Sequence, residues 1–311
     1  MSNQTHVSYF ILTGYFNMSQ LSYLFFVLLC ILYAVIVYAN ILLIVVISLS
    51  RALHEPMFVF ICSLSLNELY GSAALFPFLL LHVLRDVHTV HHYLCFLQIF
   101  CMYTYVTVEF FILAVMSYDR YLAVCFPLRY NVHMNTQKVL ILVAVTWSFP
   151  VVINVIPISL SARLKLCRNI IPKVYCDNYF IVRMACSSTT VNNVYGIVAT
   201  VLTVFAPLTF ILLTYVRILV ACFSASPQTK QRALSTCLPH FISIINFSFG
   251  VCFEVLQSRF NMSFLPDVIR ILLSLYWLVS PPILNPLMYG LHLSKIRSSF
   301  KNLFGKVAHP A

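Results

Sequence analysis

The chain has 311 residues, of which 61% are hydrophobic and only 9% are charged, and its mean hydropathy is +0.92. In soluble domains about a quarter of the residues are charged, so this composition excludes a soluble globular protein. It indicates that the chain lies in a lipid bilayer. The formal charge of +11 does not indicate nucleic-acid binding, because the basic residues lie mostly between apolar runs, as they do in membrane proteins.

Long apolar runs follow one another along the whole chain. Each reaches the roughly 20 residues needed to cross a bilayer, and backbone groups in hydrocarbon must bond within their own segment, so we expect helices. The alternating strands of about ten residues that would indicate a β-barrel do not occur. The predicted fold is therefore all-α, a bundle of seven transmembrane helices. The predicted spans are about 23–49, 57–81, 95–122, 139–160, 194–222, 234–257 and 266–290.

The loops predict an extracellular N-terminus. In that orientation the inner segments hold eleven Lys and Arg residues and the outer segments hold eight, a modest positive-inside bias. Asn3 and Asn17 begin Asn-x-Ser/Thr sequons, which are glycosylated only on the lumenal side. The apolar run from residue 21 lacks a basic n-region and a small-residue cleavage site, so we interpret it as the first span rather than a signal peptide.

The chain divides into three parts: an outer glycosylated segment, 1–22, a seven-helix domain, 23–290, and an inner tail, 291–311. In the tail, apolar side chains recur at intervals of three and four residues over about 292–304, with basic side chains on the other side. That pattern predicts a short amphipathic eighth helix on the inner leaflet.

The eleven cysteines separate by position. Seven fall within spans or at their inner ends, where we interpret them as small buried apolar residues. Cys95, Cys167, Cys176 and Cys186 lie on the outer side, where three pairings are possible. No Cys-x-x-Cys spacing indicates zinc. Histidines at 82, 88, 91 and 92 crowd the first outer loop, either as solvated loop residues or as a metal or pH sensor.

The stretch MSYDRYLAVCFPLRY, residues 116–130, places an acid and an arginine at the inner end of the third span. The Arg120 guanidinium can reach the interface there, and Asp119 can offset part of its desolvation cost. One interpretation is an ordinary snorkelling arginine with a counter-charge. The other is a switch, in which the acid holds the arginine in one state and frees it for a partner's backbone carbonyls in another.

Glu68 and Glu109 lie well inside the membrane spans, where ionisable groups are costly and functional by default. Glu109 precedes Arg120 by eleven residues, about three helical turns, so both face the same side of the third helix. Glu68, Asn40 and Asn285 lie at comparable depth, which predicts one polar cluster. Two facing carboxylates would share a proton or hold a cation such as sodium. The alternative is a hydrogen-bonded structural knot with one acid neutral.

Several of these motifs, in order and correctly spaced over nearly the whole chain, resemble one family. MSYDRYLAVCFPLRY is similar to the end of the third helix in rhodopsin-like G-protein-coupled receptors. It most resembles the odorant-receptor family, whose sequence pattern at this place is MAYDRYLAICxPLxY. The further matches are LHEPMF at 53–58 with LHxPMY, LSLNE at 64–68 with LSxxD, ALSTCLPH at 233–240 with AxSTCxSH, and PPILNPLMYG at 281–290 with PPxxNPxIY. The stretch LNELYGSAALFP, 66–77, resembles odorant receptors of fish.

Three positions depart from the family pattern. Glu68 replaces the usual aspartate, Pro239 replaces a serine, and Ser248 replaces a tyrosine. We expect Pro239 to kink or loosen the sixth helix. Ser248 argues against a mechanism that depends on an aromatic side chain at that point.

The resemblance implies a function. It implies a receptor that binds a small organic odorant in the outer half of the bundle and promotes nucleotide exchange on a stimulatory olfactory-type G protein, which raises cyclic AMP. Its implied location is the plasma membrane of olfactory sensory cilia, with lipid, odorant and heterotrimeric G protein as partners. The chain has no catalytic motif and no implied cofactor, apart from a candidate sodium ion at Glu68 and Glu109. A transporter or channel is the alternative, although the internal repeats typical of transporters do not occur.

The resemblance also implies roles for single residues. It pairs Cys95 with Cys176, and Cys167 with Cys186 inside the second outer loop. It assigns the signalling switch to residues at the inner ends of the third, fifth and seventh helices, although Tyr289 is also explained as an interfacial anchor. The candidate switch residues are Asp119, Arg120, Tyr121, Tyr215, Asn285, Pro286 and Tyr289.

Candidate ligand contacts lie on the inward faces of four helices, in their outer half. They are Met102, Tyr103, Val106, Thr107, Ala199, Thr203, Val251, Cys252, Val255, Arg259, Leu275 and Leu278. Each is also explained by plain packing. Arg259 is the notable one, since a guanidinium there would take a ligand carboxylate in a bidentate pair. The alternative for Arg259 is a snorkelling arginine at a helix end.

Overall fold

The computed structural model describes residues 8–15, 22–223, 226–260 and 265–308, so the sequons at Asn3 and Asn17 lie outside the described residues. Within these ranges, seven helices are long and apolar enough to cross a membrane, which confirms the predicted bundle. They are α1 (Ser22–Leu49), α2 (Pro56–Val83), α3 (His92–Cys125), α5 (Thr136–Ala162), the continuous run of α7 (Thr190–Thr200), η3 (Val201–Phe205) and α8 (Ala206–Phe223), α9 (Pro227–Arg259) and α10 (Asp267–His292).

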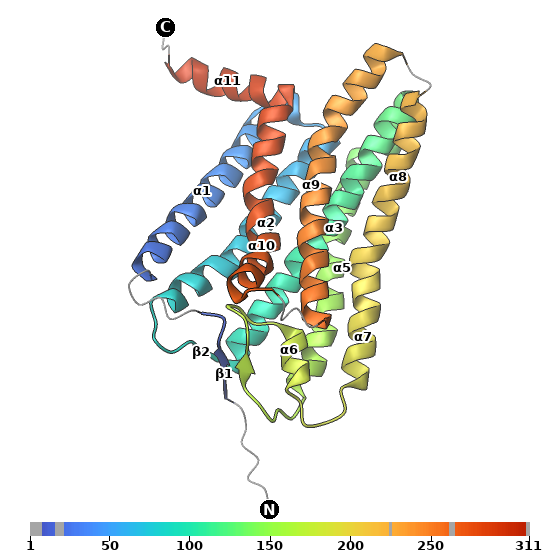
Figure 1. Cartoon of the computed structure of the whole chain (residues 1–311). Coiled ribbons are helices and arrows are strands. Elements are labelled where there is room, and N and C mark those ends of the chain that lie inside the picture. The colour runs from blue at the N-terminus through green and yellow to red at the C-terminus, as the bar shows by residue number, and fades with distance from the viewer. Residues whose placement is uncertain (1–7, 16–21, 224–225, 261–264, 309–311) are drawn as a thin grey trace, which may run out of the picture.

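The two ends of the bundle carry different elements (Figure 1). At one end α11 (Ser294–Ala308) turns away from α10. The short helix η1 (Arg51–Leu53) contacts α11, and η2 (Pro127–Arg129) and α4 (Tyr130–His133) follow and contact α3. At the other end lie β1 (Tyr9–Leu12), β2 (Thr89–His91), β3 (Ile170–Ile171) and α6 (Asn178–Arg183). These are called the α11 end and the sheet end below.

The three-stranded sheet was not predicted from the sequence. Its order is β2-β1-β3, with β1 antiparallel to β2 and parallel to β3. Phe10 and Leu12 of β1 are 0% and 1% exposed, whereas Tyr9 is 48% exposed. This alternation buries one face of the strand, but four residues are too short a pattern to identify without the loops that pair with them.

The apolar side chains of the helices divide between core and surface. Buried residues such as Phe76, Phe110 and Phe247 fill the centre of the bundle. Others point outward, including Ile31 and Tyr38 of α1, which are 56% and 69% exposed. So large an apolar surface is stable only against lipid.

Two local departures from regular helix bear on the site. The segment η3 is π-helical, a form that recurs at functional sites, and its Thr203 and Val204 are buried. The helix α9 is continuous through Pro239, whose carbonyl accepts a 3.1 Å hydrogen bond from the Ser243 hydroxyl. Pro239 therefore does not end the sixth helix, and the kink or loosening expected there stays a prediction.

Candidate ligand cavity and switch site

A cavity of about 180 Å³ lies between the helices at the sheet end. Its walls come from α3, α5, α7, η3, α9 and α10 and from the loop between α5 and α7. Nine of the twelve predicted contacts line it, namely Met102, Tyr103, Val106, Thr107, Ala199, Thr203, Val251, Val255 and Arg259. These nine residues lie on α3, α7, η3 and α9, and their contact with a ligand stays a prediction.

Three predicted contacts do not line this cavity. Leu278 is 1% exposed and belongs to the main apolar core, with Leu275 packed against the same core. Trp277 lines the cavity from α10 instead. Cys252 follows the lining residue Val251, and one step along a helix turns a side chain by about 100°. Motif spacing gives the depth of a residue but not the rotation of its helix.

Polar lining residues were largely missed. Asn154 of α5 donates a 3.2 Å hydrogen bond to the Thr107 hydroxyl, which itself donates to the Tyr103 carbonyl at 2.9 Å. Glu254 of α9 and Asp177 of the α5–α7 loop add two carboxylates. An amide or an acid in an apolar span is a signal that could have identified Asn154 and Glu254.

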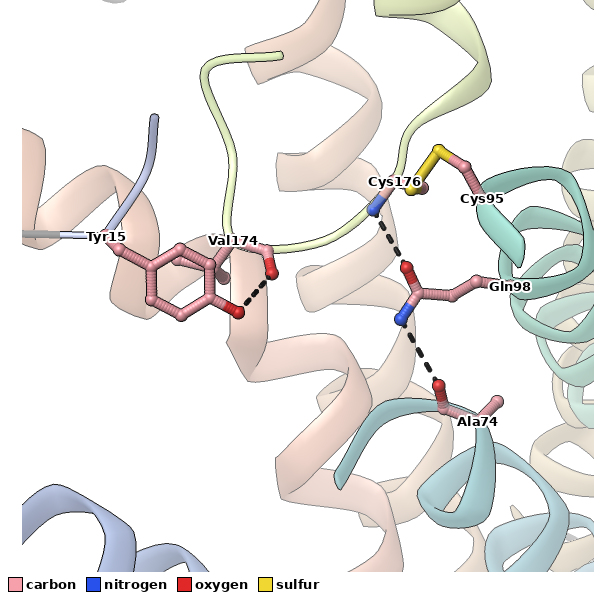
Figure 2. The surroundings of a disulfide bond; sticks show 6 residues. All are labelled: Tyr15, Ala74, Cys95, Gln98, Val174 and Cys176. Carbon is pink, nitrogen blue, oxygen red and sulfur yellow. Dashed lines mark hydrogen bonds between the residues drawn. A yellow bond between two sulfur atoms is a disulfide. The ribbon is translucent and has the colours of Figure 1, made fainter. Parts of the chain in front are cut away.

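A disulfide ties the α5–α7 loop over the cavity (Figure 2). Cys95 at the start of α3 is bonded to Cys176, which confirms the pairing implied by the family resemblance. The Gln98 side chain accepts a 3.0 Å hydrogen bond from the Cys176 backbone N–H and donates at 3.3 Å to the Ala74 carbonyl of α2. The loop is thus attached to two helices at one point.

Two further contacts hold the same loop. Cys167 is bonded to Cys186, as the resemblance implied. The Tyr15 hydroxyl donates a 2.8 Å hydrogen bond to the Val174 carbonyl, so the N-terminal segment also contacts the loop (Figure 2). The remaining seven cysteines are free thiols. Cys222 and Cys237 are buried as expected, whereas the other five are only partly buried.

A buried lysine joins the loop to α9. Lys173 is 3% exposed, and its ammonium forms ion pairs with Asp177 at 3.1 Å and with Glu254. It also lies 5.2 Å from the ring centroid of Tyr175. Burial by itself lowers the pKa of Lys173, but the two carboxylates raise it well above its ordinary value. The lysine therefore stays charged, and the triad carries a net charge of about −1 at neutral pH.

Two arginines lie against one tyrosine at the mouth of the cavity. The guanidinium carbon of Arg259 is 4.9 Å from the Tyr179 ring centroid, and that of Arg183 is 5.8 Å from it. Arg259 and Tyr179 line both the cavity and an outer vestibule of about 850 Å³ that Arg183 and Arg270 also line. Within the described ranges no carboxylate pairs with Arg259. Three arginines therefore line this mouth.

The two intramembrane acids meet in the bundle interior. The Asn285 amide donates to Glu68 and, at 3.1 Å, to Glu109. Asn67 donates to Glu109 at 2.9 Å, and the Tyr105 hydroxyl donates to Glu68 at 2.9 Å. The structure therefore brings together three of the four predicted members and adds Asn67 and Tyr105, which the sequence analysis missed.

Asn40, the fourth predicted member, has different partners. Its amide donates to the backbone carbonyls of Ile36 and Pro282 at 3.0 and 2.9 Å. The carbonyl of residue 282 is free because Pro286 has no N–H to donate to it. Asn40 thus binds the proline-interrupted backbone of α10 rather than either acid.

At the α11 end Asp119 and Arg120 form the predicted ion pair, with Nη2 and Oδ2 2.5 Å apart. The Tyr130 hydroxyl donates a 2.6 Å hydrogen bond to the other Asp119 oxygen. Burial, and then the Asp119 charge, raise the pKa of Tyr130 above its ordinary value, so it remains a donor. Tyr130 is the last letter of the 116–130 motif, yet we did not predict its role.

The other switch candidates are distributed around this pair. The Tyr215 hydroxyl is 2.6 Å from the Nδ1 atom of His240, a buried residue of α9 in the ALSTCLPH stretch. Tyr289 of the Asn-Pro motif is 1% exposed, and Tyr121 is half-buried with its ring edge-on to Phe126. The structure therefore adds a contact between Tyr215 of α8 and His240 of α9 to the predicted switch residues.

The crowded histidines of the first outer loop do not gather into one site. His88 stacks on Tyr15 with centroids 4.2 Å apart, and His82 lies 6.1 Å from the same ring. His91 and His92 lie against Tyr93 instead. Burial lowers the pKa of His88, so it is neutral at pH 7. These rings pack the N-terminal segment onto the bundle.

Comparison with known proteins agrees with this architecture. The sequence model described as olfactory receptor matches residues 29–306. Human olfactory receptor 52D1 is 34% identical over 297 residues, 94% of this chain and 93% of that protein, and human olfactory receptor 11A1 is 32% identical over 305 residues, 97% and 95% of the two chains.

The fold is similar to that of squid rhodopsin, with a TM-score of 0.73 and 15% identity over 95% of this chain and 93% of that one. The fish-like character of residues 66–77 stays a prediction. The match over nearly the full length, together with seven membrane-spanning helices, shows that the chain is a multi-pass membrane receptor rather than an enzyme and belongs to the olfactory receptor family.

Proposed function

We propose that the chain is an odorant-activated receptor whose cavity at the sheet end binds a small organic molecule from outside the cell. The observation that carries this proposal is the cavity itself, which lies beneath a disulfide-bonded loop and is lined by apolar side chains with a few polar groups. This is the usual character of a small-molecule site. The proposal makes the sheet end extracellular and the α11 end cytoplasmic, in the plasma membrane of olfactory cilia.

The chemistry of the mouth favours an acidic odorant. Arg259 lines the cavity, lies on the Tyr179 ring and pairs with no carboxylate of the described residues. A ligand carboxylate would supply the missing counter-charge through a bidentate pair. Lys173 pairs with both Glu254 and Asp177 and so reduces their repulsion of that ligand. Met102, Val106 and Val251 would contact the apolar part of the ligand.

The signal would pass along α9, which has contacts at both ends. At the sheet end Glu254 and Arg259 belong to the ligand site, and at the α11 end His240 contacts Tyr215. A ligand that binds one arrangement of α9 more tightly shifts the population toward it. In the active arrangement Arg120 would leave Asp119, and Tyr289 would turn toward the opened cleft. A stimulatory heterotrimeric G protein would bind there, exchange its nucleotide and raise cyclic AMP.

Glu68 and Glu109 form a candidate cation site on this path. Four carboxylate oxygens and the side chains of Asn67, Tyr105 and Asn285 meet there, and oxygen-rich sites suit hard cations. We propose that sodium binds between the acids in the inactive arrangement. Gly71 makes the geometry possible, because a side chain at this position would overlap the Tyr105 ring and move its hydroxyl from Glu68.

The experiment is a cyclic AMP assay in cells that express the full chain together with an olfactory-type G protein. The panel contains carboxylic acids, the corresponding alcohols, amino acids and steroids. A dose-dependent cyclic AMP rise that disappears without the G protein supports the proposal. Ligand uptake or ionic current that persists without the G protein would instead identify a transporter or channel.

A further inference from the structure

A third cavity lies on the lipid-facing side of the bundle at the α11 end. This groove has a volume of about 320 Å³ and lies between α1, α10 and α11. Its walls are nearly all apolar and include Leu42, Val46, Leu287, Leu291 and Ile296. The groove is separate from the odorant cavity and from the Asp119–Arg120 pair, none of whose residues line it.

Gly290 keeps the groove open in the last turn of α10. A Cβ atom built at Gly290 meets nothing within 4 Å. At Gly250 of α9, by contrast, a Cβ would lie 2.7 Å from the Trp277 side chain. Gly250 is needed for helix packing, whereas the missing side chain at Gly290 leaves space that no described protein atom fills. An apolar space of this kind facing the bilayer is filled by hydrocarbon, because empty volume forfeits dispersion contacts.

Two cations stand at the rim of the groove. Arg297 and Lys301 both line it, both are exposed, and they lie four residues apart on α11, which places them on one helix face. The sequence of α11 contains no acidic residue, and no carboxylate of the described chain pairs with either cation. Lys295 differs, since it pairs with Glu55 at 2.5 Å and does not line the groove.

We propose that this groove binds one anionic phospholipid, with an acyl chain in the apolar channel beside Gly290 and the phosphate between Arg297 and Lys301. An anionic phospholipid matches both properties of the groove, because its acyl chain fits the apolar channel and its phosphate pairs with the cations at the rim. Basic side chains next to a membrane helix attract anionic headgroups. A zwitterionic phospholipid fits the channel equally well but gains less at the rim. We expect roughly a 5- to 30-fold preference for the anionic lipid.

The test is native mass spectrometry of the purified full-length chain, released from nanodiscs with equal amounts of phosphatidylserine and phosphatidylcholine that carry the same acyl chains. The wild type should retain one phosphatidylserine in preference to phosphatidylcholine. Arg297→Gln combined with Lys301→Gln should abolish the preference while some lipid of either kind is kept. Gly290→Phe, which fills the channel, should reduce retention of both lipids.

Two matched controls separate this site from general effects. Lys295→Gln removes the same charge from the same helix outside the groove and should retain phosphatidylserine like the wild type. Gly290→Ala adds a methyl group that meets no atom and should also behave as the wild type, which gives a folded reference if Gly290→Phe does not fold.

Equal retention of the two lipids by the wild type would overturn the proposal. So would phosphatidylserine retention that survives both the double substitution and Gly290→Phe. A dimer mass that Gly290→Phe removes irrespective of lipid would assign the groove to a second copy of the chain, which also overturns it.

Discussion

Lys173 and Glu254, 81 residues apart in the sequence, form a buried ion pair that joins the loop over the ligand cavity to α9. The attachments of this loop include a disulfide to α3, a tyrosine hydrogen bond to the N-terminal segment, and this pair to α9. Of these, only the ion pair contacts the helix that we propose to move. Loop and helix are expected to respond to ligand together.

Lys173→Met should destabilise the receptor. The substitution leaves Asp177 and Glu254 without their cation, and breaking a buried pair in this way typically costs about 3–5 kcal/mol. We expect a lower melting temperature of the detergent-solubilised receptor and reduced surface expression. Lys165→Met, at an exposed position of the same loop, is the matched control. If the two variants melt at the same temperature, the ion pair contributes nothing to stability.

Arg259→Ala should selectively remove responses to acids. The EC50 for carboxylic odorants should rise at least about tenfold, since a charge-assisted pair is worth about 1.5–3 kcal/mol. The alcohol with the same chain is the ligand control, and its EC50 should not change. Arg259→Lys should give an intermediate value, because lysine keeps the charge but loses the bidentate geometry. An unchanged acid response at equal surface expression would show that Arg259 is only a helix-end arginine.

Asp119→Asn should raise basal cyclic AMP. An amide pairs more weakly with Arg120, so the arginine is released more often toward its active position. Tyr130→Phe removes a single hydrogen bond to Asp119 and should raise the basal signal in the same direction by a smaller amount. Basal cyclic AMP, normalised to surface receptor, measures both. If both variants have the basal cyclic AMP level of the wild type, the Asp119–Arg120 ion pair only anchors the helix at the membrane interface.

Glu109→Gln should abolish any dependence of signalling on sodium. The substitution keeps the size of the side chain and its capacity for hydrogen bonds, but it removes a carboxylate from the candidate cation site. EC50 values are measured in membranes while sodium is replaced by choline at constant ionic strength. The wild type should become more sensitive to odorant as sodium falls, and the variant should not change. A wild type that is indifferent to sodium would argue for a purely hydrogen-bonded cluster.

Acidification should weaken the contact between the N-terminal segment and the first outer loop. Burial lowers the pKa of His88 below its ordinary value of about 6.5, so the unfolded state takes up the proton more readily. The stability that neutral His88 contributes is therefore present above about pH 6.5 and is lost as pH falls toward the folded-state pKa.

The measurement compares melting temperatures of the wild type and His88→Phe at pH 7.5 and 5.5. Phenylalanine keeps a ring against Tyr15 but does not titrate, so the wild type should lose more stability than the variant. Equal losses would mean that the other histidines, common to both proteins, carry the whole pH dependence.

The depth of a site residue in the membrane could be predicted from the sequence, because it depends only on the position of that residue along its own helix. The depth of Thr107 and Val251 follows from their distance to the motifs on the same helix, and both line the cavity. Cys252, next to Val251, does not line the cavity, since depth does not give the rotation of a helix about its axis. The partners of the predicted residues, such as Asn67 and Tyr130, were missed for a related reason. They lie on other turns or other helices, and their contacts exist only after packing.

By itself, the sequence determined the seven spans, the family and the identity of the charged residues inside the membrane. It could do so because the bilayer imposes a minimum length of apolar helix and makes every buried charge exceptional. Only the tertiary structure decided that Lys173 neutralises Glu254, that β1 pairs with two loops, and that Gly290 opens a groove. Such contacts depend on the paths of loops and the rotation of helices, which are set by the packing of the whole bundle.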